Sequence, residues 1–218
     1  YLNGKKWNGN GYNINGNIEF EIKDGRGNVK EYDYDDNLSF EGEYLNGLKN
    51  GKGKEYFFNG NIIFEGEYLN GRKNGKGKEY SINGEISFEG DYLNGQRNGN
   101  GKEYYDDGKL IFEGEYINGK RWNGKGYNIN GSMEYEIING NGKIKEYNFH
   151  SKLEYEGEYI NGERSGKGKE YDFNGKLLFE GKYLKGERWN GKGFNKNGKL
   201  DFEIKDGKGK VKEYNYLT

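Results

Sequence analysis

The chain of 218 residues carries 35 basic and 36 acidic side chains, so its formal net charge is −1, and 33% of its residues are charged while 31% are hydrophobic. The two signs are interleaved along the whole sequence. Nucleic-acid binders usually concentrate Lys and Arg in a patch or stripe, so this distribution argues against a nucleic-acid partner. Cysteine is absent, which excludes disulfides and thiolate chemistry, and no apolar stretch approaches the roughly 18 residues of a membrane-spanning helix.

The apolar content is concentrated in aromatic rings. Aromatic residues make up 17% of the chain, including 21 Tyr and 12 Phe, whereas disordered chains with so many charges are poor in aromatic residues. The chain also contains 40 Gly and no Pro. A Gly inside a helix costs about 1 kcal/mol, and few long stretches lack one, so the composition predicts strands and turns instead of helices.

A repeat runs through the sequence. The stretch FEGEYLNGLKNGKGKEYFFNGNII occupies residues 40–63, and FEGEYLNGRKNGKGKEYSINGEIS follows it at residues 64–87. A period of this length is typical of repeat arrays, in which each repeat buries its apolar face against its neighbours. We therefore predict a single array over residues 1–218, with repeats that begin near residues 1, 20, 40, 64, 88, 112, 135, 155, 179 and 202.

Each full repeat contains two predicted strands. In the repeat that begins at residue 40, apolar or small residues alternate with polar ones over residues 38–44, which indicates a strand with one apolar face. A turn at Asn46-Gly47 follows, with a second turn signal at Asn50-Gly51, because both residue types tolerate positive φ. The second strand covers residues 51–56, and Asn59-Gly60 turns the chain into the next repeat.

These hairpins predict an all-β fold: an elongated, twisted antiparallel β-meander built from tandem β-hairpin repeats. Ten repeats of two strands, at roughly 4.8 Å per strand, would form a sheet on the order of 90–100 Å long. Gly42, Gly51 and Gly53 are expected to leave room for rings of neighbouring repeats to lie on the backbone. The opposite face is expected to pair charges across strands, with Glu41 and Glu43 near Lys52 and Lys54.

The run GEYLNGLKNGKGKEYFFNG at residues 42–60 resembles the MORN repeat, whose usual form is Gly-Glu-aromatic, Asn-Gly-Lys, Gly-x-Gly, an aromatic pair and Asp/Asn-Gly. The likeness recurs at residues 66–84, 90–108 and 157–175, with Trp-bearing variants at 114–131 and 181–198, and with the short repeats it covers essentially the whole chain. Two features depart from that form: Tyr in place of Trp after Gly-Glu, and Asn where the family often has His, at Asn50, Asn74 and Asn98. The resemblance implies an interaction or architectural module, often one that links proteins to membranes or to cytoskeletal structures.

Three repeats carry Trp, at Trp7, Trp122 and Trp189, and each precedes a short repeat. In the short repeats the turn contracts to Asp24-Gly25, Asn139-Gly140 or Asp206-Gly207, and aliphatic pairs replace glycines: Ile22 with Val29, Ile137 with Ile144, and Ile204 with Val211. One interpretation is structural, with each Trp covering the aliphatic pair of its neighbour. The other is functional, because Trp is enriched at binding hot spots.

A candidate interaction surface follows from these aromatic positions. It comprises the three Trp residues and the Tyr that follows Gly-Glu, Gly-Asp or Gly-Lys in the full repeats: Trp7, Trp122, Trp189, Tyr44, Tyr68, Tyr92, Tyr116, Tyr159 and Tyr183.

The sequence contains no residues that we predict to be catalytic, cofactor-binding or metal-binding. The one histidine, His150, lies at a predicted turn, and nothing marks a triad with Ser151. The acidic run at residues 33–37 lacks the spacing of a calcium loop and aligns with a turn. GNGKGKEY has no strand–loop–helix setting or Lys-Ser/Thr ending, so it is not a phosphate-binding loop. Glutamate pairs recur in most repeats, whereas catalytic carboxylates need unlike environments.

The leading hypothesis is a non-enzymatic scaffold that binds another protein, whose identity the sequence does not indicate. One alternative is binding to an anionic membrane surface, although interleaved Glu offsets the attraction of Lys and Arg. Another is self-assembly into a filament or end-to-end oligomer, since both ends of the array look cut and open sheet ends are templates for pairing. No targeting segment is visible. Cytoplasmic, cytoskeletal or membrane-associated locations all fit.

Overall fold

The computed structural model describes residues 1–148 and 150–209. Within these residues the chain forms eighteen strands and no helix, which confirms the all-β prediction. The described part therefore contains no helix that could span a membrane. The chain divides into two compact units, one of residues 1–108 with 117–119 and the other of residues 109–116 with 120–218.

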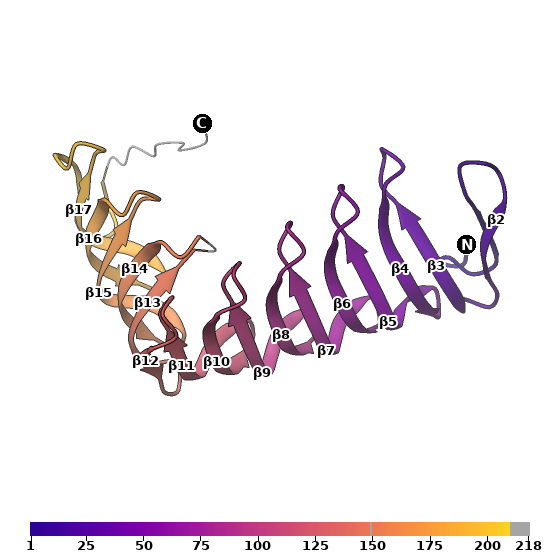
Figure 1. The fold of residues 1–218 in the computed structure, drawn as a ribbon, viewed down its shortest axis with the longest axis horizontal. Helices are drawn as coiled ribbons and strands as arrows, with labels where there is room; N and C mark the ends of the chain where they lie inside the picture. Colours follow the sequence, from indigo (N-terminus) through magenta and orange to yellow (C-terminus); the bar gives the residue numbers. More distant parts are fainter. Residues whose placement is uncertain (149, 210–218) are drawn as a thin grey trace. The chain divides into compact units, whose positions relative to one another are not determined.

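The first compact unit holds nine strands. They are β1 (Gly9–Tyr12), β2 (Ile18–Ile22), β3 (Gly27–Tyr32), β4 (Leu38–Leu45), β5 (Leu48–Tyr56), β6 (Ile62–Leu69), β7 (Arg72–Tyr80), β8 (Ile86–Leu93) and β9 (Gln96–Tyr104). Strands β3 to β9 lie side by side in chain order, each antiparallel to the next (Figure 1). This arrangement is the predicted meander.

The second compact unit holds the other nine. They are β10 (Leu110–Ile117), β11 (Lys120–Tyr127), β12 (Met133–Ile137), β13 (Gly142–Tyr147), β14 (Leu153–Ile160), β15 (Glu163–Tyr171), β16 (Leu177–Leu184), β17 (Glu187–Phe194) and β18 (Leu200–Ile204). Strands β10, β11 and β12 are neighbours in chain order, and β13 to β18 form a six-stranded antiparallel sheet.

Two-residue turns close the hairpins where Asn-Gly predicts them. Asn46 and Gly47 have φ values of 52° and 71°, and Leu45 pairs directly with Leu48 on either side. Positive φ at both central positions defines a type I′ turn, whose twist matches that of the flanking strands. The contracted turns of the short repeats have the same conformation, with φ values of 51° and 71° at Asp24 and Gly25.

The second turn signal, at Asn50-Gly51, is not a turn. Strand β5 begins at Leu48 and passes through this pair, so the prediction of a second strand starting at residue 51 was wrong. The register against β4 shifts between Gly42 and Tyr44, and Gly51 has a φ of 94°. The positive φ of Gly51 therefore allows a β-bulge, which lengthens one strand by extra residues.

One face of each sheet carries a continuous row of aromatic rings, which we call the ring face. Phe40, Phe64 and Phe88 are no more than 1% exposed. Tyr68 lies edge-on between two of them, with ring centroids 5.5 Å from Phe40 and 5.6 Å from Phe64. Edge-to-face contacts at such distances add to the burial energy. Tyr68 and Tyr92 thus each join the Phe of their own repeat to that of the preceding repeat, in perpendicular rather than stacked geometry.

Glycines make room for these rings, as predicted for two of the three positions. A β-carbon built on Gly53 would lie 2.7 Å from Phe40 and 3.2 Å from Tyr68, and one built on Gly42 would lie 2.8 Å from the Cζ atom of Phe40. Gly51 has a different role, because the side chain nearest to it is that of Glu43 and its φ serves the bulge.

The short repeats interrupt the hydrogen-bonded ladder. Strands β2 and β3 belong to different sheets and are joined across their turn only by an isolated bridge between Lys23 and Arg26. Strands β12 and β13 are separated in the same way, with a bridge between Ile138 and Asn141. These breaks fall where aliphatic residues replace the strand glycines. Ile22, Val29, Ile137, Ile144 and Ile204 are buried, while Val211 lies outside the described residues.

Candidate functional site

The predicted Tyr positions lie inside the ring face. Tyr44, Tyr68, Tyr92, Tyr116 and Tyr183 are between 1% and 8% exposed. Tyr159 is partly buried, and its hydroxyl donates a hydrogen bond to Glu146. The rings of these residues therefore stabilise the array, and the surface that a partner can reach consists of other side chains.

The Trp residues pack against the short repeats that follow them. A β-carbon built on Gly140 would lie 2.8 Å from Cζ3 of Trp122, and one built on Gly207 would lie 2.7 Å from the same atom of Trp189. The carbonyl of Trp122 also accepts the backbone N–H of Gly140, at 2.7 Å. These contacts support the structural interpretation of the Trp, with the turn glycine as the contact. Trp189 retains 38% exposure, while Trp7 is partly buried and its carbonyl accepts the N–H of Gly25.

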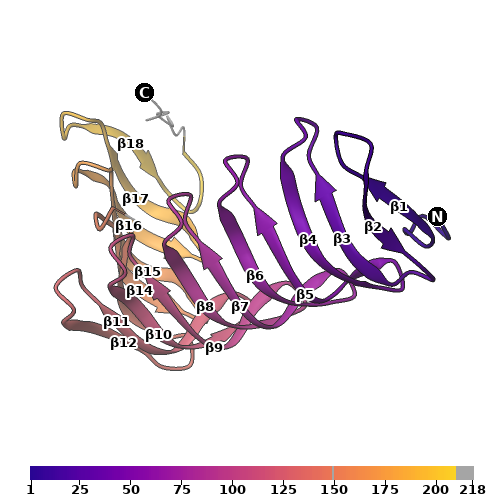
Figure 2. The ribbon, with the colours of Figure 1, turned by 45° about the vertical axis from the view of Figure 1, so that its right-hand side comes forward.

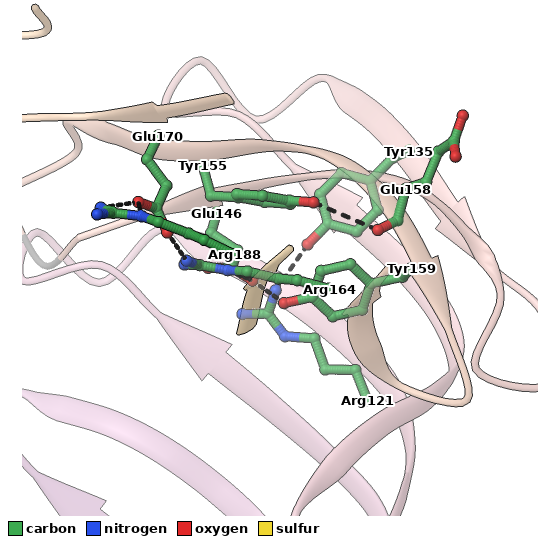
Figure 3. A network of polar contacts seen from close by, with 9 residues as sticks. All are labelled: Arg121, Tyr135, Glu146, Tyr155, Glu158, Tyr159, Arg164, Glu170 and Arg188. Atoms are coloured by element: carbon green, nitrogen blue, oxygen red, sulfur yellow. Dashed lines mark hydrogen bonds and ion pairs between the residues drawn. The ribbon is translucent and has the colours of Figure 1, made fainter. Parts of the chain in front are cut away.

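Basic side chains clamp successive repeats together over the rings. The guanidinium of Arg164 lies 4.3 Å from the ring centroid of Tyr155. It forms ion pairs with Glu146 of the preceding repeat and, at 2.8 Å, with Glu170 of its own strand. Arg188 repeats the arrangement one repeat later, donating from Nε to Glu170 at 2.7 Å (Figure 3). Cation–π contacts and ion pairs of this kind link the repeats that begin at residues 155 and 179 to the repeats before them.

These contacts shift pKa values on the ring face. Burial works against the charge of Arg164, but the hydrogen bond to Glu146, together with the negative charges of Glu146 and Glu170, outweighs burial and raises the Arg164 pKa. Burial likewise opposes ionisation of Glu31, yet its hydrogen bonds from Lys6 and Tyr44 leave the pKa of that carboxyl below its usual value. Burial raises the pKa of Tyr44 above its ordinary range, helped by the hydrogen bond to Glu31.

Reasoning from the sequence missed this clamp. It assigned the carboxylates to the opposite face and did not consider the Glu of each Lys-Glu-Tyr segment. The available signal was periodic. A basic residue recurs at the same position of the full repeats, as Lys49, Lys73, Arg97, Arg121, Arg164 and Arg188. In the pair of Arg164 with Glu146, the acidic residue lies eighteen residues before the basic one. Only the register shows that the two meet.

The opposite face of each sheet carries alternating acidic and basic strands, and we call it the charged face. Glu41 lies directly opposite Lys54, as predicted, and Lys52 is paired with Glu67. The ion pair between Lys76 and Asp91, at 2.6 Å, shows the same relation one repeat further. The Tyr that ends each second strand also contributes, and the hydroxyl of Tyr80 donates to Glu65 at 2.6 Å.

In the second compact unit the charged face is hollowed. The hollow has a volume of about 990 Å³ and extends over strands β12 to β17. Its floor includes the backbone of Gly157, Gly168, Gly181 and Gly191, which lie opposite one another in register. Its charged lining consists of four glutamates and six lysines: Glu134, Glu156, Glu158, Glu180, Lys143, Lys145, Lys167, Lys169, Lys182 and Lys192. The lining therefore has an excess of positive charge.

The turns between repeats form a separate edge. Figure 2 shows the loops that follow β3, β5 and β7 pointing to one side of the first compact unit. Their second residues are apolar and exposed, at 108% for Tyr34, 71% for Phe58 and 45% for Ile82, and Ile14 is 87% exposed in the turn before β2. The carbonyl of Ile82 accepts the side-chain amide of Asn61 at 2.9 Å, which places neighbouring tips side by side.

The acidic run at residues 33–37 is a turn, as predicted. The Oδ1 atom of Asp33 accepts the backbone N–H groups of Asp35 and Asn37, each at 2.9 Å. The hydrogen bond from Asn37 contributes most to lowering the Asp33 pKa. His150 also lies in a turn, where its backbone N–H donates a hydrogen bond to Oδ1 of Asn148. In the described ranges, no group of three His, Cys, Asp or Glu residues is placed to hold a metal ion.

Comparison with known families agrees with this geometry. A model of the MORN repeat matches residues 40–62, 64–86, 88–109 and 155–176, and these four segments correspond to hairpins with the rings, turns and bulges described above. The chain therefore contains four MORN repeats, three of them consecutive over residues 40–109 and one at residues 155–176. A comparison with curated proteins found none that matches. MORN repeats are generally non-catalytic modules that bind proteins or membranes.

One departure from the usual MORN sequence has a structural role here. Asn98, in the position that often holds His, accepts the backbone N–H of Asn118 at 3.0 Å, and Asn50 accepts that of Asn70 at 3.3 Å. In the Trp-bearing repeats Asn123 makes the same bond to Asn139 at 2.7 Å. The asparagine therefore holds the hairpin turn of the following repeat, and these turns are linked along the edge of the array.

Proposed function

We propose that this MORN-repeat chain is a non-enzymatic scaffold that binds another protein through the charged face of its sheets. The observation that supports the proposal most directly is the hollow of about 990 Å³ in the second compact unit. It offers a concave surface with charges of both signs, whereas the ring face is occupied by its own packing. Charged surfaces of this kind give specificity and orient an approaching partner.

The environment of the carboxylates supports a binding role over catalysis. Glu65, Glu134 and Glu156 each accept a hydrogen bond from the Tyr that ends a second strand, at 2.6 Å from Tyr80, Tyr147 and Tyr171. Acid–base catalysis requires two carboxyl groups in unlike environments. Here the same environment recurs in successive repeats.

A capture experiment with the purified chain tests the proposal. The immobilised chain is exposed to an extract, bound proteins are identified by mass spectrometry, and each candidate is prepared in pure form. The proposal expects at least one candidate to bind the chain saturably, with affinity that weakens as salt is added because surface charges are screened. Failure of every purified candidate to bind, together with turnover of a substrate by the chain, would overturn it.

A second candidate function is binding to a membrane surface, and the apolar turn tips of the first compact unit favour it. The exposed side chains of Tyr34 and Phe58 lie on neighbouring loops, and aromatic side chains partition well into the interface of a bilayer. Flotation with neutral and anionic vesicles tests this function, using Phe58→Asp as the variant and Asn59→Asp as its neighbour control. Membrane binding requires flotation that the first substitution abolishes and the second retains.

A further inference from the structure

The pairing of Lys167 with Lys182 breaks the charge pattern of the array. The corresponding pairs elsewhere join a basic residue to an acidic one: Lys52 with Glu67, Lys76 with Asp91, and Lys143 with Glu158. Between β15 and β16 the acidic member is replaced by Lys182, so two lysines lie directly opposite each other. Like charges in directly opposed positions destabilise a sheet, which makes this position costly for folding.

The neighbours of these two lysines do not neutralise them. Lys182 faces Asn190 on its other side. Across the described residues 1–148 and 150–209, neither Lys167 nor Lys182 takes part in an ion pair, and both side chains are exposed. In the matching position of the first compact unit, Lys76 and Asp91 form an ion pair at 2.6 Å.

Three of the four acidic side chains of the hollow are already engaged. Glu156 accepts the hydroxyl of Tyr171 at 2.6 Å, and Glu158 accepts the backbone N–H of Lys167 at 3.0 Å. Glu134 forms an ion pair with Lys145 at 2.7 Å. These bonds leave the exposed lysines as the groups most available to a ligand.

We propose, on the basis of the scaffold function above, that the hollow binds an acidic segment of a partner protein whose carboxylates contact Lys167 and Lys182. The hollow is long and open, and four register-matched glycines form part of its floor, from Gly157 to Gly191. The distance from β13 to β17 is about 19 Å at the usual strand spacing, which an extended peptide of about six residues spans. Alternate side chains of such a peptide point to the same side, so acidic residues at every second position face the lysines.

The charge distribution favours a peptide over a membrane or a nucleic acid. Within the hollow the lysines are flanked by Glu156 and Glu180, which lie beside Lys169 in register. A planar anionic bilayer, or a backbone with a phosphate at every residue, would bring negative charge against these glutamates. A peptide, in contrast, can place carboxylates opposite the lysines and uncharged side chains opposite the glutamates.

The test uses the full chain and a labelled peptide of about eight residues, alternating Glu with Ser and long enough to cross the hollow, with a Gln–Ser peptide as reference. Fluorescence anisotropy at low salt should show binding of the Glu peptide and not of the Gln peptide. Lys182→Glu should weaken binding about tenfold, and Lys182→Gln by a smaller factor, because attraction between surface charges depends on sign and distance. Lys182→Glu restores the acidic residue of the other repeats, so we expect its melting temperature to be no lower than that of the unsubstituted chain.

Two controls distinguish peptide binding in the hollow from binding that depends only on the net charge of the chain. Lys199→Glu changes the net charge equally but lies in the turn between β17 and β18, and it should leave binding within twofold. Glu67→Lys creates the same opposed lysines in the first compact unit, next to Lys52 and outside the hollow, and should leave binding of the Glu peptide within twofold.

Three results would overturn the inference. The first is no binding of the Glu peptide to the unsubstituted chain. The second is equal weakening by Lys182→Glu and Lys199→Glu. The third is binding of anionic vesicles or single-stranded oligonucleotides that depends on Lys182 and that the Glu peptide does not displace. The scaffold proposal would survive each of these results if a purified partner still bound saturably, so the two failures are distinguishable.

Discussion

A β-carbon on Gly77 would lie 2.5 Å from Cε2 and Cζ of Phe64, so the ring occupies the space that a side chain at residue 77 would need. Phe64 itself is 0% exposed. We predict that Gly77→Ala destabilises the chain by about 1–3 kcal/mol, since neither a buried ring nor the sheet backbone can move freely to relieve the overlap. Chemical denaturation followed by circular dichroism measures the loss.

The control for this substitution is Lys78→Ala in the same strand. Lys78 lies on the charged face, with 43% of its side chain exposed, so the substitution should change the free energy of unfolding by less than about 0.5 kcal/mol. Equal effects of the two substitutions would contradict the packing of Phe64 on glycine.

Arg164→Ala should destabilise the second compact unit, while Arg164→Lys should not. Removing the guanidinium leaves Glu146 and Glu170 without their shared partner, at a cost of about 1–3 kcal/mol for a partly buried pair. Lysine is used at the equivalent position elsewhere, where Lys49 lies 3.8 Å from the ring centroid of Phe40. Thermal unfolding of both variants measures the difference. The clamp has no stabilising role if Arg164→Ala melts at the same temperature as the unsubstituted chain.

Trp122→Ala separates a packing role from a docking role for the Trp residues. Because the ring lies against Gly140, we expect a loss of about 2 kcal/mol in the free energy of unfolding and retention of partner binding at temperatures where the variant is folded. Trp189→Ala should cost less, since that ring is 38% exposed. Docking through Trp122 requires the opposite pattern, with unchanged stability and loss of binding.

Asn123→Ala tests the structural role of the asparagine at the position that often holds His in MORN repeats. Its Oδ1 atom accepts the N–H of Asn139 at 2.7 Å, and loss of such a hydrogen bond costs about 1 kcal/mol. Asn130→Ala, in an exposed turn, serves as the matched control. Amide hydrogen exchange at Asn139 should accelerate in the first variant alone, and unchanged exchange there would show that the bond does not hold the turn.

The chain should lose stability in alkaline solution. Burial, followed by the hydrogen bond to Glu65, raises the pKa of Tyr80 to about 12, and burial with the bond to Glu156 does the same for Tyr171. An unfolded tyrosine titrates near pH 10. The stabilising effect of these neutral hydroxyls is therefore complete below pH ~10 and is lost as the pH rises through the folded-state value of about 12.

Ultraviolet absorbance of phenolate, recorded together with circular dichroism, measures this dependence. Most tyrosine ionisation should coincide with loss of the strand signal. Complete ionisation near pH ~10 with the strand signal intact would contradict the buried hydroxyls.

Much of the local structure could be predicted because its causes are local. Alternation over residues 38–44 identifies a strand, and Asn46-Gly47 identifies a two-residue turn, since both depend on backbone conformations that a few residues determine. The Asn50-Gly51 signal was misread because a positive φ serves a bulge as well as it serves a turn. Composition alone does not distinguish the two, and the hydrogen bonds of the neighbouring strand decide between them.

The candidate site was less predictable. The Tyr residues chosen for a binding surface are buried, because the same rings that suit an interface also suit a core. The like-charge pair of Lys167 with Lys182 was visible only as one unusual Lys in the sequence.

The sequence by itself determined the period, the hairpins and the row of rings, since these follow from spacing, turn chemistry and the small size of glycine. Only the tertiary structure decided which Glu meets which Arg across repeats, and that Lys182 lies opposite Lys167. The physical reason is register. Each bulge adds residues to one strand, so the partner of a side chain on the next strand depends on where the bulge falls and not on spacing along the chain.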